Sequence, residues 1–153
     1  MQLGRVALVT AAFVVGCATT PDSSFSDGSV SEAREFYAAY TTALRTHQRD
    51  ALARFYRSDQ ALVIFNGARR VLTNSALDSI YRGPWNGPAF FAFDSLRFET
   101  ISRSQVLVTG GFRWLPRESA DTGRFVYLSI LDRTAAGLKI RVEHETRLQP
   151  PAR

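Results

Sequence analysis

The spacing of apolar residues predicts three helices in the first half of the chain. A capping box at Ser29–Glu32 precedes apolar residues that recur at helical spacing over 33–44, which is the pattern of an amphipathic helix. Asp50 is placed to cap a short second helix, and Ser75 to open a third that ends at Gly83-Pro84. The positions that these two short helices should bury are Leu52, Phe55, Tyr56, Leu77, Ile80 and Tyr81.

Alternating segments predict strands in the rest of the chain. Asn66-Gly67 separates two short β-type runs, and this dipeptide tolerates the positive φ angles of a two-residue hairpin turn. Longer strands are expected at 93–101, 105–114, 124–132 and 138–148, and their short connections favour antiparallel pairing. The predicted order α-α-β-β-α-β-β-β-β describes an α+β domain, in which three N-terminal helices pack on a strongly curved antiparallel sheet to form a cone.

The first residues read as a targeting segment. A positive start and the apolar run 6–15 are followed by Gly16-Cys17, and Val14-Val15-Gly16-Cys17 resembles the lipobox of bacterial lipoproteins. That resemblance implies a lipoprotein signal peptide at 1–17, acylation of Cys17, and membrane lipid as the partner of the mature N-terminus. The alternative is an ordinary signal peptide with an incidental cysteine.

The residues after the cysteine indicate how the domain would be held. The segment 18–28 is polar and turn-rich, so it is expected to be a flexible tether to a single domain at 29–149. Such a chain would be lipid-anchored in the cell envelope. By resemblance to lipoproteins of bacteria with two membranes, Ala18 after the cysteine favours the outer membrane, or a position at its periplasmic face.

Composition narrows the partners. The chain has 153 residues, 45% of them apolar and 22% charged, which suits one globular domain. Its net charge of +5 comes from basic residues scattered along the chain, whereas nucleic-acid binding needs them gathered on one face. We therefore expect no nucleic-acid partner. One cysteine and two histidines provide no plausible zinc site, and we find no phosphate-binding or nucleophile motif, so neither a metal nor a cofactor is expected.

Three segments carry a resemblance to a known fold family. They are FYAAYTTAL at 36–44, RFYRSDQALVIFNG at 54–67 and GLKIRVEHETRL at 137–148. Their order resembles the nuclear transport factor 2-like (NTF2-like) superfamily, specifically its SnoaL-like members, over about 30–148. The resemblance implies a cone with an open pocket and, in many members, dimerisation through the outer face of the sheet.

The last strand supplies the main candidate residues. Residues 138–148 alternate apolar and charged side chains, which places His144 and Thr146 on the concave apolar face and the charged stripe Lys139–Arg147 outside. In a pocket, His144 could act as an acid or base or bind a ligand. The alternative is a core histidine that hydrogen-bonds to a neighbour.

Four aromatic residues complete the candidate site. Tyr37 and Tyr40 lie on the buried side of the first helix, where a hydroxyl could reach a ligand, although packing alone also explains them. Trp85 and Trp114 are placed to line the mouth of a pocket. The predicted ligand-binding residues are therefore these four together with His144 and Thr146.

The ketosteroid isomerases of the superfamily offer a test for catalysis. Their oxyanion-hole tyrosine would fall at Tyr40, but their aspartate base would fall at Ile64, and their second aspartate within Phe125–Ser129, which has no carboxylate. The sequence therefore favours a non-catalytic role, namely binding of a small apolar molecule or an accessory function. The alternatives are an isomerase, cyclase or hydrolase that uses His144, with Tyr40, and a homodimeric assembly module, whose interface the charged stripe Lys139–Arg147 would weaken.

Overall fold

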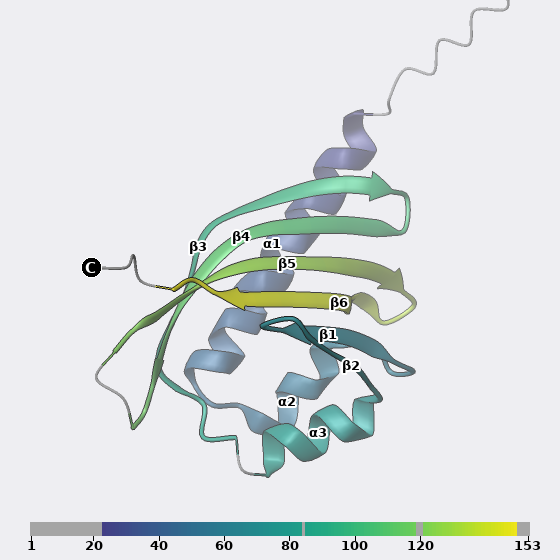
Figure 1. Cartoon of the computed structure of the whole chain (residues 1–153). Helices are drawn as coiled ribbons and strands as arrows, with labels where there is room; N and C mark the ends of the chain where they lie inside the picture. Colours follow the sequence, from purple (N-terminus) through teal and green to yellow (C-terminus); the bar gives the residue numbers. More distant parts are fainter. Residues whose placement is uncertain (1–22, 84, 119–120, 150–153) are drawn as a thin grey trace, which may run out of the picture.

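The computed structural model describes residues 23–83, 85–118 and 121–149 of the chain, and the predicted signal peptide with Cys17 lies outside them. In the described part, three α-helices and six strands follow one another as α-α-β-β-α-β-β-β-β (Figure 1), which is the predicted order. The helices cover one face of a strongly curved, unclosed sheet, so the α+β class is confirmed. Within these residues, no helix is both long and apolar enough to cross a membrane.

The first helix, α1, spans Ser23–Arg45, so residues 23–28, which were expected to belong to the tether, are helical. The predicted capping box does not form, because Ser29 and Glu32 lie inside this helix. Their side chains instead contact Arg133, which pairs with Glu32 at 2.5 Å and donates to the Ser29 hydroxyl at 3.4 Å. The predicted apolar face is confirmed, with less than 5% exposure at its buried positions Ala33, Tyr37, Tyr40 and Leu44.

The two short helices bury the expected side chains but begin differently. α2 spans Arg49–Leu52 and runs into the 3-10 turn η1, Ala53–Phe55, and Asp50 lies inside α2, where it pairs with Arg82. α3 spans Asn74–Arg82, and its N-cap is Thr73 rather than Ser75. Of the six predicted positions, Leu52, Tyr56, Leu77 and Tyr81 are buried, Phe55 is half-buried, and Ile80 remains 38% exposed.

The strands are β1 (Ala61–Phe65), β2 (Ala68–Leu72), β3 (Pro88–Ser102), β4 (Gln105–Pro116), β5 (Gly123–Thr134) and β6 (Gly137–Arg147). They form one sheet in the order β2-β1-β6-β5-β4-β3. The hairpin turn is as predicted, with φ of 48° at Asn66 and 83° at Gly67. The pairings are antiparallel except between β1 and β6, which are parallel, so the sheet is mixed rather than wholly antiparallel as predicted.

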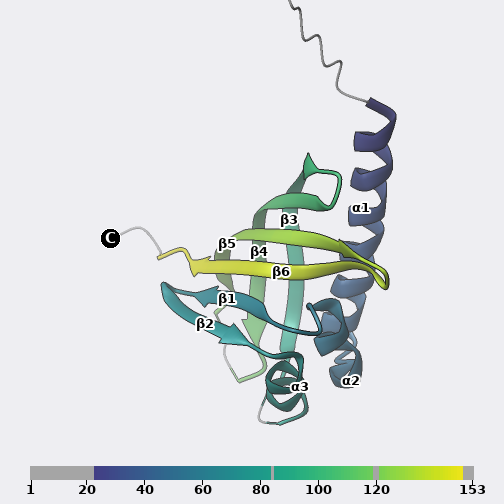
Figure 2. The same ribbon diagram turned by 90° about the vertical axis from the view of Figure 1, so that its right-hand side faces the viewer.

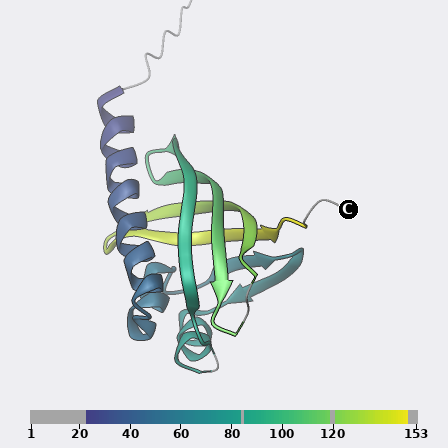
Figure 3. The ribbon, with the colours of Figure 1, turned by 90° about the vertical axis from the view of Figure 1, so that its left-hand side faces the viewer.

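The curvature of the sheet creates space beside α1. β3 and β4 are long and bend where the pairing shifts between Asp94 and Arg97, at a bulge that places Ser95 at a φ of 52°. Figures 2 and 3 show α1 lying across the concave face against β3, with α2 and α3 gathered at one end of the sheet. At the end near the β1–β2 hairpin, α1, α3 and the concave face of the sheet border a cavity.

Candidate functional site

A bulge in β6 decides which of its side chains face the concave side. Ile130 of β5 pairs with Val142, and the next residue, Leu131, pairs with Ile140. Arg141 is therefore an extra residue opposite a regular strand, which is the definition of a β-bulge. Because side chains alternate with a period of two, one inserted residue inverts the alternation beyond it.

The inversion overturns the predicted placement of His144 and Thr146. After the bulge, Glu143 and Glu145 face the concave side, and both line the cavity there. His144 and Thr146 point to the other face and do not line the cavity; the imidazole Nε2 lies 3.2 Å from the threonine hydroxyl. The prediction that these two residues face the pocket is wrong, because the sequence pattern does not reveal the extra residue.

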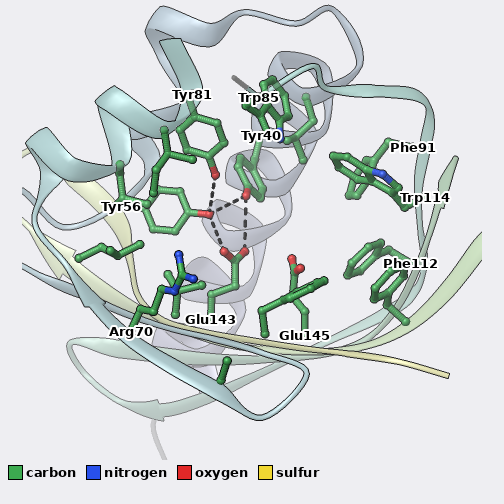
Figure 4. Close-up of a pocket in the computed structure, with 18 of the residues that line it drawn as sticks. Tyr40, Tyr56, Arg70, Tyr81, Trp85, Phe91, Phe112, Trp114, Glu143 and Glu145 are labelled. Carbon is green, nitrogen blue, oxygen red and sulfur yellow. Dashed lines mark hydrogen bonds between the residues drawn. The ribbon is translucent and has the colours of Figure 1, made fainter. Parts of the chain in front are cut away.

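The cavity has a volume of about 520 Å³ (Figure 4). It lies between the C-terminal half of α1, α3, the β1–β2 hairpin and the ends of β3, β4 and β5 near that hairpin. Its mouth is formed by exposed residues, among them Phe65, Arg70 and Ile80. Most of the wall is apolar, and its aromatic members are Tyr40, Tyr56, Phe65, Tyr81, Trp85, Phe91, Phe93, Phe112, Trp114 and Phe125.

Glu143 is a buried carboxyl group held by tyrosine hydroxyls. Its exposed fraction is 3%. Tyr56 donates to its Oε2 at 2.5 Å and Tyr127 to its Oε1 at 2.9 Å, while the Tyr40 hydroxyl lies 3.4 Å from Oε1. A buried carboxylate is tolerated when donors satisfy its oxygens, and these hydroxyls provide that satisfaction.

The remaining tyrosines extend this network. The Tyr81 hydroxyl lies 3.0 Å from that of Tyr56, and the Tyr37 hydroxyl lies 2.8 Å from that of Tyr127 and 2.5 Å from the Ser129 hydroxyl. All five tyrosines of the chain therefore belong to one hydrogen-bonded network around Glu143. Each outer hydroxyl can donate inwards, so the network is consistent with a carboxylate at its centre.

Burial shifts the acidity of these groups. Desolvation raises the pKa of Glu143 from its ordinary value of 4.5, and the donated tyrosine hydrogen bonds oppose this rise. Desolvation, and secondly the charge of Glu143, raise the pKa of Glu145 well above 4.5. Desolvation, followed by the charge of Glu143, also raises the pKa values of Tyr40 and Tyr56 well above 10.0, so both hydroxyls keep their protons and act as donors.

Comparison with known proteins places the domain by its shape rather than by its sequence. No protein-family model matches the chain, and no curated protein matches its sequence. An NTF2-like protein of unknown function from Pseudomonas putida superposes with a TM-score of 0.69 at 17% identity, covering 82% of this chain and 91% of that one. A ketosteroid isomerase-like protein from Erwinia carotovora gives 0.63 at 16%, covering 76% and 94%.

An NTF2-like protein with a cystatin-like fold from Novosphingobium aromaticivorans gives a TM-score of 0.64 at 14% identity, covering 82% of this chain and 85% of that one. The chain has the NTF2-like fold. The fold predicted from the three sequence segments is thereby confirmed, and the pocket lies inside the cone that the resemblance implied.

Within this NTF2-like fold, the carboxyl groups of the cavity belong to β6, whereas the isomerase base would fall on β1, at Ile64. Ile64, where the isomerase base would fall, does not line the cavity, although its neighbours Val63 and Phe65 do. Among the described residues that line the cavity, the carboxyl groups are those of Glu143 and Glu145. The isomerase arrangement is therefore not reproduced here.

Tyr40, Trp85 and Trp114 line the cavity as predicted, and the two tryptophan rings lie 6.3 Å apart. Tyr37 does not line it, because its hydroxyl is turned away into the network with Tyr127 and Ser129. That any of these residues binds a ligand remains a prediction. Within the described residues, no three histidine, cysteine, aspartate or glutamate side chains are grouped to hold a metal ion.

Three polar residues of the cavity, Glu143, Glu145 and Arg70, were not predicted from the sequence. The sequence does contain a signal for the two acids. Glu143 and Glu145 are two residues apart on one predicted strand, and every tyrosine of the chain lies at a predicted core position or in a predicted strand. That signal points to a face that carries both acids, but not to the side of the sheet on which the face lies.

Proposed function

We propose that this chain is a membrane-tethered domain that binds a small, flat, largely apolar molecule. The observation that carries the proposal is the cavity of about 520 Å³, with aromatic walls and two carboxyl groups on its floor. Ligand sites are typically concave, mostly apolar and of roughly 300–1,000 Å³, with a few polar groups that orient the ligand. This cavity has each of these properties.

The wall suits a planar body. Phe112 and Phe125 are stacked with centroids 4.6 Å apart, and Phe91 meets the Trp114 ring edge-on at 6.0 Å. Ring faces and edges that border an open cavity offer offset-stacked or T-shaped contacts to another ring. Each Å² of apolar surface that the ligand and the wall remove from water contributes about 25 cal/mol of favourable free energy. This burial is the main source of affinity expected here.

The tether proposal rests on the lipobox-like segment at Cys17, and the arrangement of the domain is compatible with it. α1 begins at Ser23 at one end of the molecule, whereas the β1–β2 hairpin and α3 border the mouth near the other end (Figures 1–3). A lipid at Cys17 would therefore hold the mouth away from the membrane, in the cell envelope. The ligand would then arrive from the aqueous phase.

The catalytic alternative loses the residue on which it depended. His144 lies outside the cavity, so it cannot transfer a proton to a molecule bound there. An acid–base reaction in the cavity would have to use one of the carboxyl groups that line it, Glu143 or Glu145, in its place. Ligand binding needs no such residue, which makes it the function that the geometry supports best.

The ligand-binding proposal can be tested with N-phenyl-1-naphthylamine, a neutral planar dye that fluoresces in apolar surroundings. Wild-type protein should bind it saturably. Ala68→Trp places a bulky ring at the exposed mouth and should abolish the signal, whereas Arg69→Trp puts the same ring on the other face of β2 and should not. A signal absent from wild type, or equal in all three proteins, would contradict the proposal.

The tether can be tested separately in the native host. The mature N-terminus should be Cys17 carrying acyl chains, detected by mass spectrometry, and the protein should fractionate with membranes. Cys17→Ser should move it to the soluble or unprocessed fraction. A mature N-terminus at another residue, without lipid, would refute the anchor and leave the binding proposal standing.

A second candidate is assembly with another copy of this chain through the outer face of the sheet. The bulge removes Glu143 and Glu145 from that face, so the charged stripe expected to weaken a dry interface is broken. Across neighbouring strands the outer face carries a paired row of apolar side chains, Val71, Leu62, Val142, Ile130 and Leu107. An apolar row of this kind suits a self-complementary two-fold interface.

A further inference from the structure

The two carboxyl groups on the floor of the cavity differ in how they are satisfied. Glu143 accepts hydrogen bonds from Tyr56 and Tyr127. The carboxyl of Glu145 points into the cavity (Figure 4) and makes no hydrogen bond or ion pair with any side chain that the structure describes. It is therefore the polar group that remains available to a bound molecule.

The charged side chains near Glu145 do not neutralise the negative charge of its carboxylate. Glu143, on the same face of the same strand, is a second acid. Among the described residues that line the cavity, Arg70 on β2 is the basic one, and it is exposed at the mouth, where water and salt screen its charge. The interior of the cavity therefore favours a positive charge, which interacts more strongly there than in water because the surroundings are apolar.

The wall offers a second source of attraction for a cation. The rings of Phe112, Trp114 and Phe125 line the cavity together with Glu145. The negative face of an aromatic ring attracts a cation within about 6 Å, and the attraction is stronger where water is excluded. A cavity that combines a carboxyl group with aromatic rings is a suitable environment for an alkylated or aryl-alkyl ammonium group.

We propose that the cavity selects flat apolar molecules that carry an amine or ammonium group, with the cation placed at the carboxylate of Glu145. This inference rests on the proposed small-molecule binding and specifies the class of ligand. Glu143 is excluded as the primary contact because the tyrosine hydroxyls already occupy its oxygens. Arg70 carries the same sign of charge as the proposed ligand, so it is not the contact for the ammonium group.

The pH dependence distinguishes this ligand from a neutral one. In the empty cavity, burial and Glu143 raise the pKa of Glu145, so a fraction of its carboxyl groups is protonated. A bound cation stabilises the carboxylate and expels that proton, so affinity for an amine should rise with pH until Glu145 is ionised in the free protein. A neutral carbonyl that accepts from the protonated acid would show the opposite trend. The tyrosine hydroxyls that face this region, those of Tyr40, Tyr56 and Tyr81, keep their protons over the neutral range because burial raises their pKa values, and the guanidinium of Arg70 is at the mouth.

Three probes with one aromatic body test the inference: 2-(1-naphthyl)ethylamine, 2-(1-naphthyl)ethanol and 1-naphthylacetate. Calorimetric titration of the full chain should show the amine binding about tenfold or more tightly than the alcohol, and the acetate most weakly. Glu145→Gln keeps the shape of the side chain and should reduce the amine-to-alcohol ratio to about one. Glu99→Gln, at an exposed position of β3, should leave the ratio unchanged.

The outcomes separate the two proposals. Equal binding of amine and alcohol, or tighter binding of the acetate, would overturn the cation inference and leave small-molecule binding intact. A Glu145→Gln protein that still prefers the amine would also overturn it, and its retained binding of the alcohol would show that the variant is folded. If none of the three probes binds, both proposals fail.

Discussion

Glu143 shows how a single side chain organises the interior of this domain. A carboxyl group that is 3% exposed would be strongly destabilising without partners, and the tyrosine hydroxyls supply them from α1, from the residue that follows η1, and from β5. These hydroxyls stand at the inner ends of rings whose bodies build the aromatic core. The same tyrosines therefore fill volume and satisfy a charge.

Deleting a hydroxyl that donates to the Glu143 carboxyl group should destabilise the domain more than deleting a hydroxyl that contacts only another tyrosine. Tyr56→Phe deletes the 2.5 Å bond to the carboxyl group and should lower the free energy of unfolding by about 1.5–3 kcal/mol. Tyr81→Phe deletes only the 3.0 Å contact between two hydroxyls and should cost about 0.5–1.5 kcal/mol. Urea unfolding measures both; a larger loss in Tyr81→Phe would contradict the assigned centre of the network.

Glu145 should make stability depend on pH. Its folded pKa is raised above the ordinary 4.5, so its contribution is fully present below about pH 4.5 and is lost as the pH rises through the folded value. Glu145→Gln lacks this titration. Its stability relative to wild type should therefore increase above pH 4.5, by about 1.4 kcal/mol for each unit of the pKa difference, and then level off.

Urea unfolding of wild type and Glu145→Gln between pH 4 and pH 8 measures this difference. The exposed Glu99→Gln variant serves as the matched control and should follow wild type throughout. A constant difference between Glu145→Gln and wild type over the whole range would show that Glu145 titrates normally in the folded protein.

At the scale of elements, replacing either of two glycines by alanine should change the stability of the domain in opposite directions, because their backbone conformations differ. Gly67 occupies the hairpin turn at a φ of 83°, which an alanine adopts only with strain, whereas Gly28 lies inside α1 and has open space where a Cβ would stand. We expect Gly67→Ala to destabilise the domain by about 1 kcal/mol and Gly28→Ala to stabilise it by about 0.5–1 kcal/mol. Thermal unfolding of the two variants checks the signs, and equal signs would refute one of the two assignments.

The β6 bulge is the element-scale feature with the largest effect on the site. The residue inserted at Arg141 exchanges the faces on which the following side chains lie, which brings Glu143 and Glu145 into the cavity and leaves His144 outside. The Arg141 side chain forms an ion pair with Asp132 at 3.3 Å, and Asp132 also pairs with Arg57. Bulges re-aim side chains in this way beside binding sites in other sheets.

At the scale of the whole molecule, the cavity and the outer sheet face lie on opposite sides of one sheet, so ligand binding and self-assembly can be tested independently. If the outer face forms a dimer, light scattering of wild type should show mass increasing with concentration. Val126→Glu introduces a charge at a 50%-exposed position paired with Thr146 on that face and should keep the protein monomeric.

Ile101→Glu places the same charge at an equally exposed position near the β3–β4 turn and should leave assembly unchanged. A wild-type protein that stays monomeric at all concentrations would refute the assembly candidate. Binding of N-phenyl-1-naphthylamine should be the same in both variants, because neither residue lines the cavity.

Local rules explain what was predictable. The spacing of apolar residues in α1, the Asn66-Gly67 turn and the alternation within β4 and β5 depend on neighbours in sequence, and the expected elements formed. Tyr40 of α1 and Trp114 of β4 line the pocket as predicted because the fold class determines how these elements face it, and Trp85 lines it from the loop between α3 and β3. The predicted start of α1 is wrong because the helix begins at Ser23, upstream of Ser29 and Glu32, whose side chains contact Arg133, a residue distant in sequence, instead of capping the helix.

By itself, the amino-acid sequence determined the α+β class, the order of elements and the aromatic character of the interior, since these follow from periodicity and turn chemistry. Tertiary structure alone decided that β1 lies parallel to β6, that Arg141 is an inserted residue, and that Glu143 and Glu145 share the cavity. The physical reason is register. Which face of a strand is buried depends on how it pairs with its neighbours around a curved sheet, and one additional residue in that pairing exchanges an imidazole for two carboxyl groups.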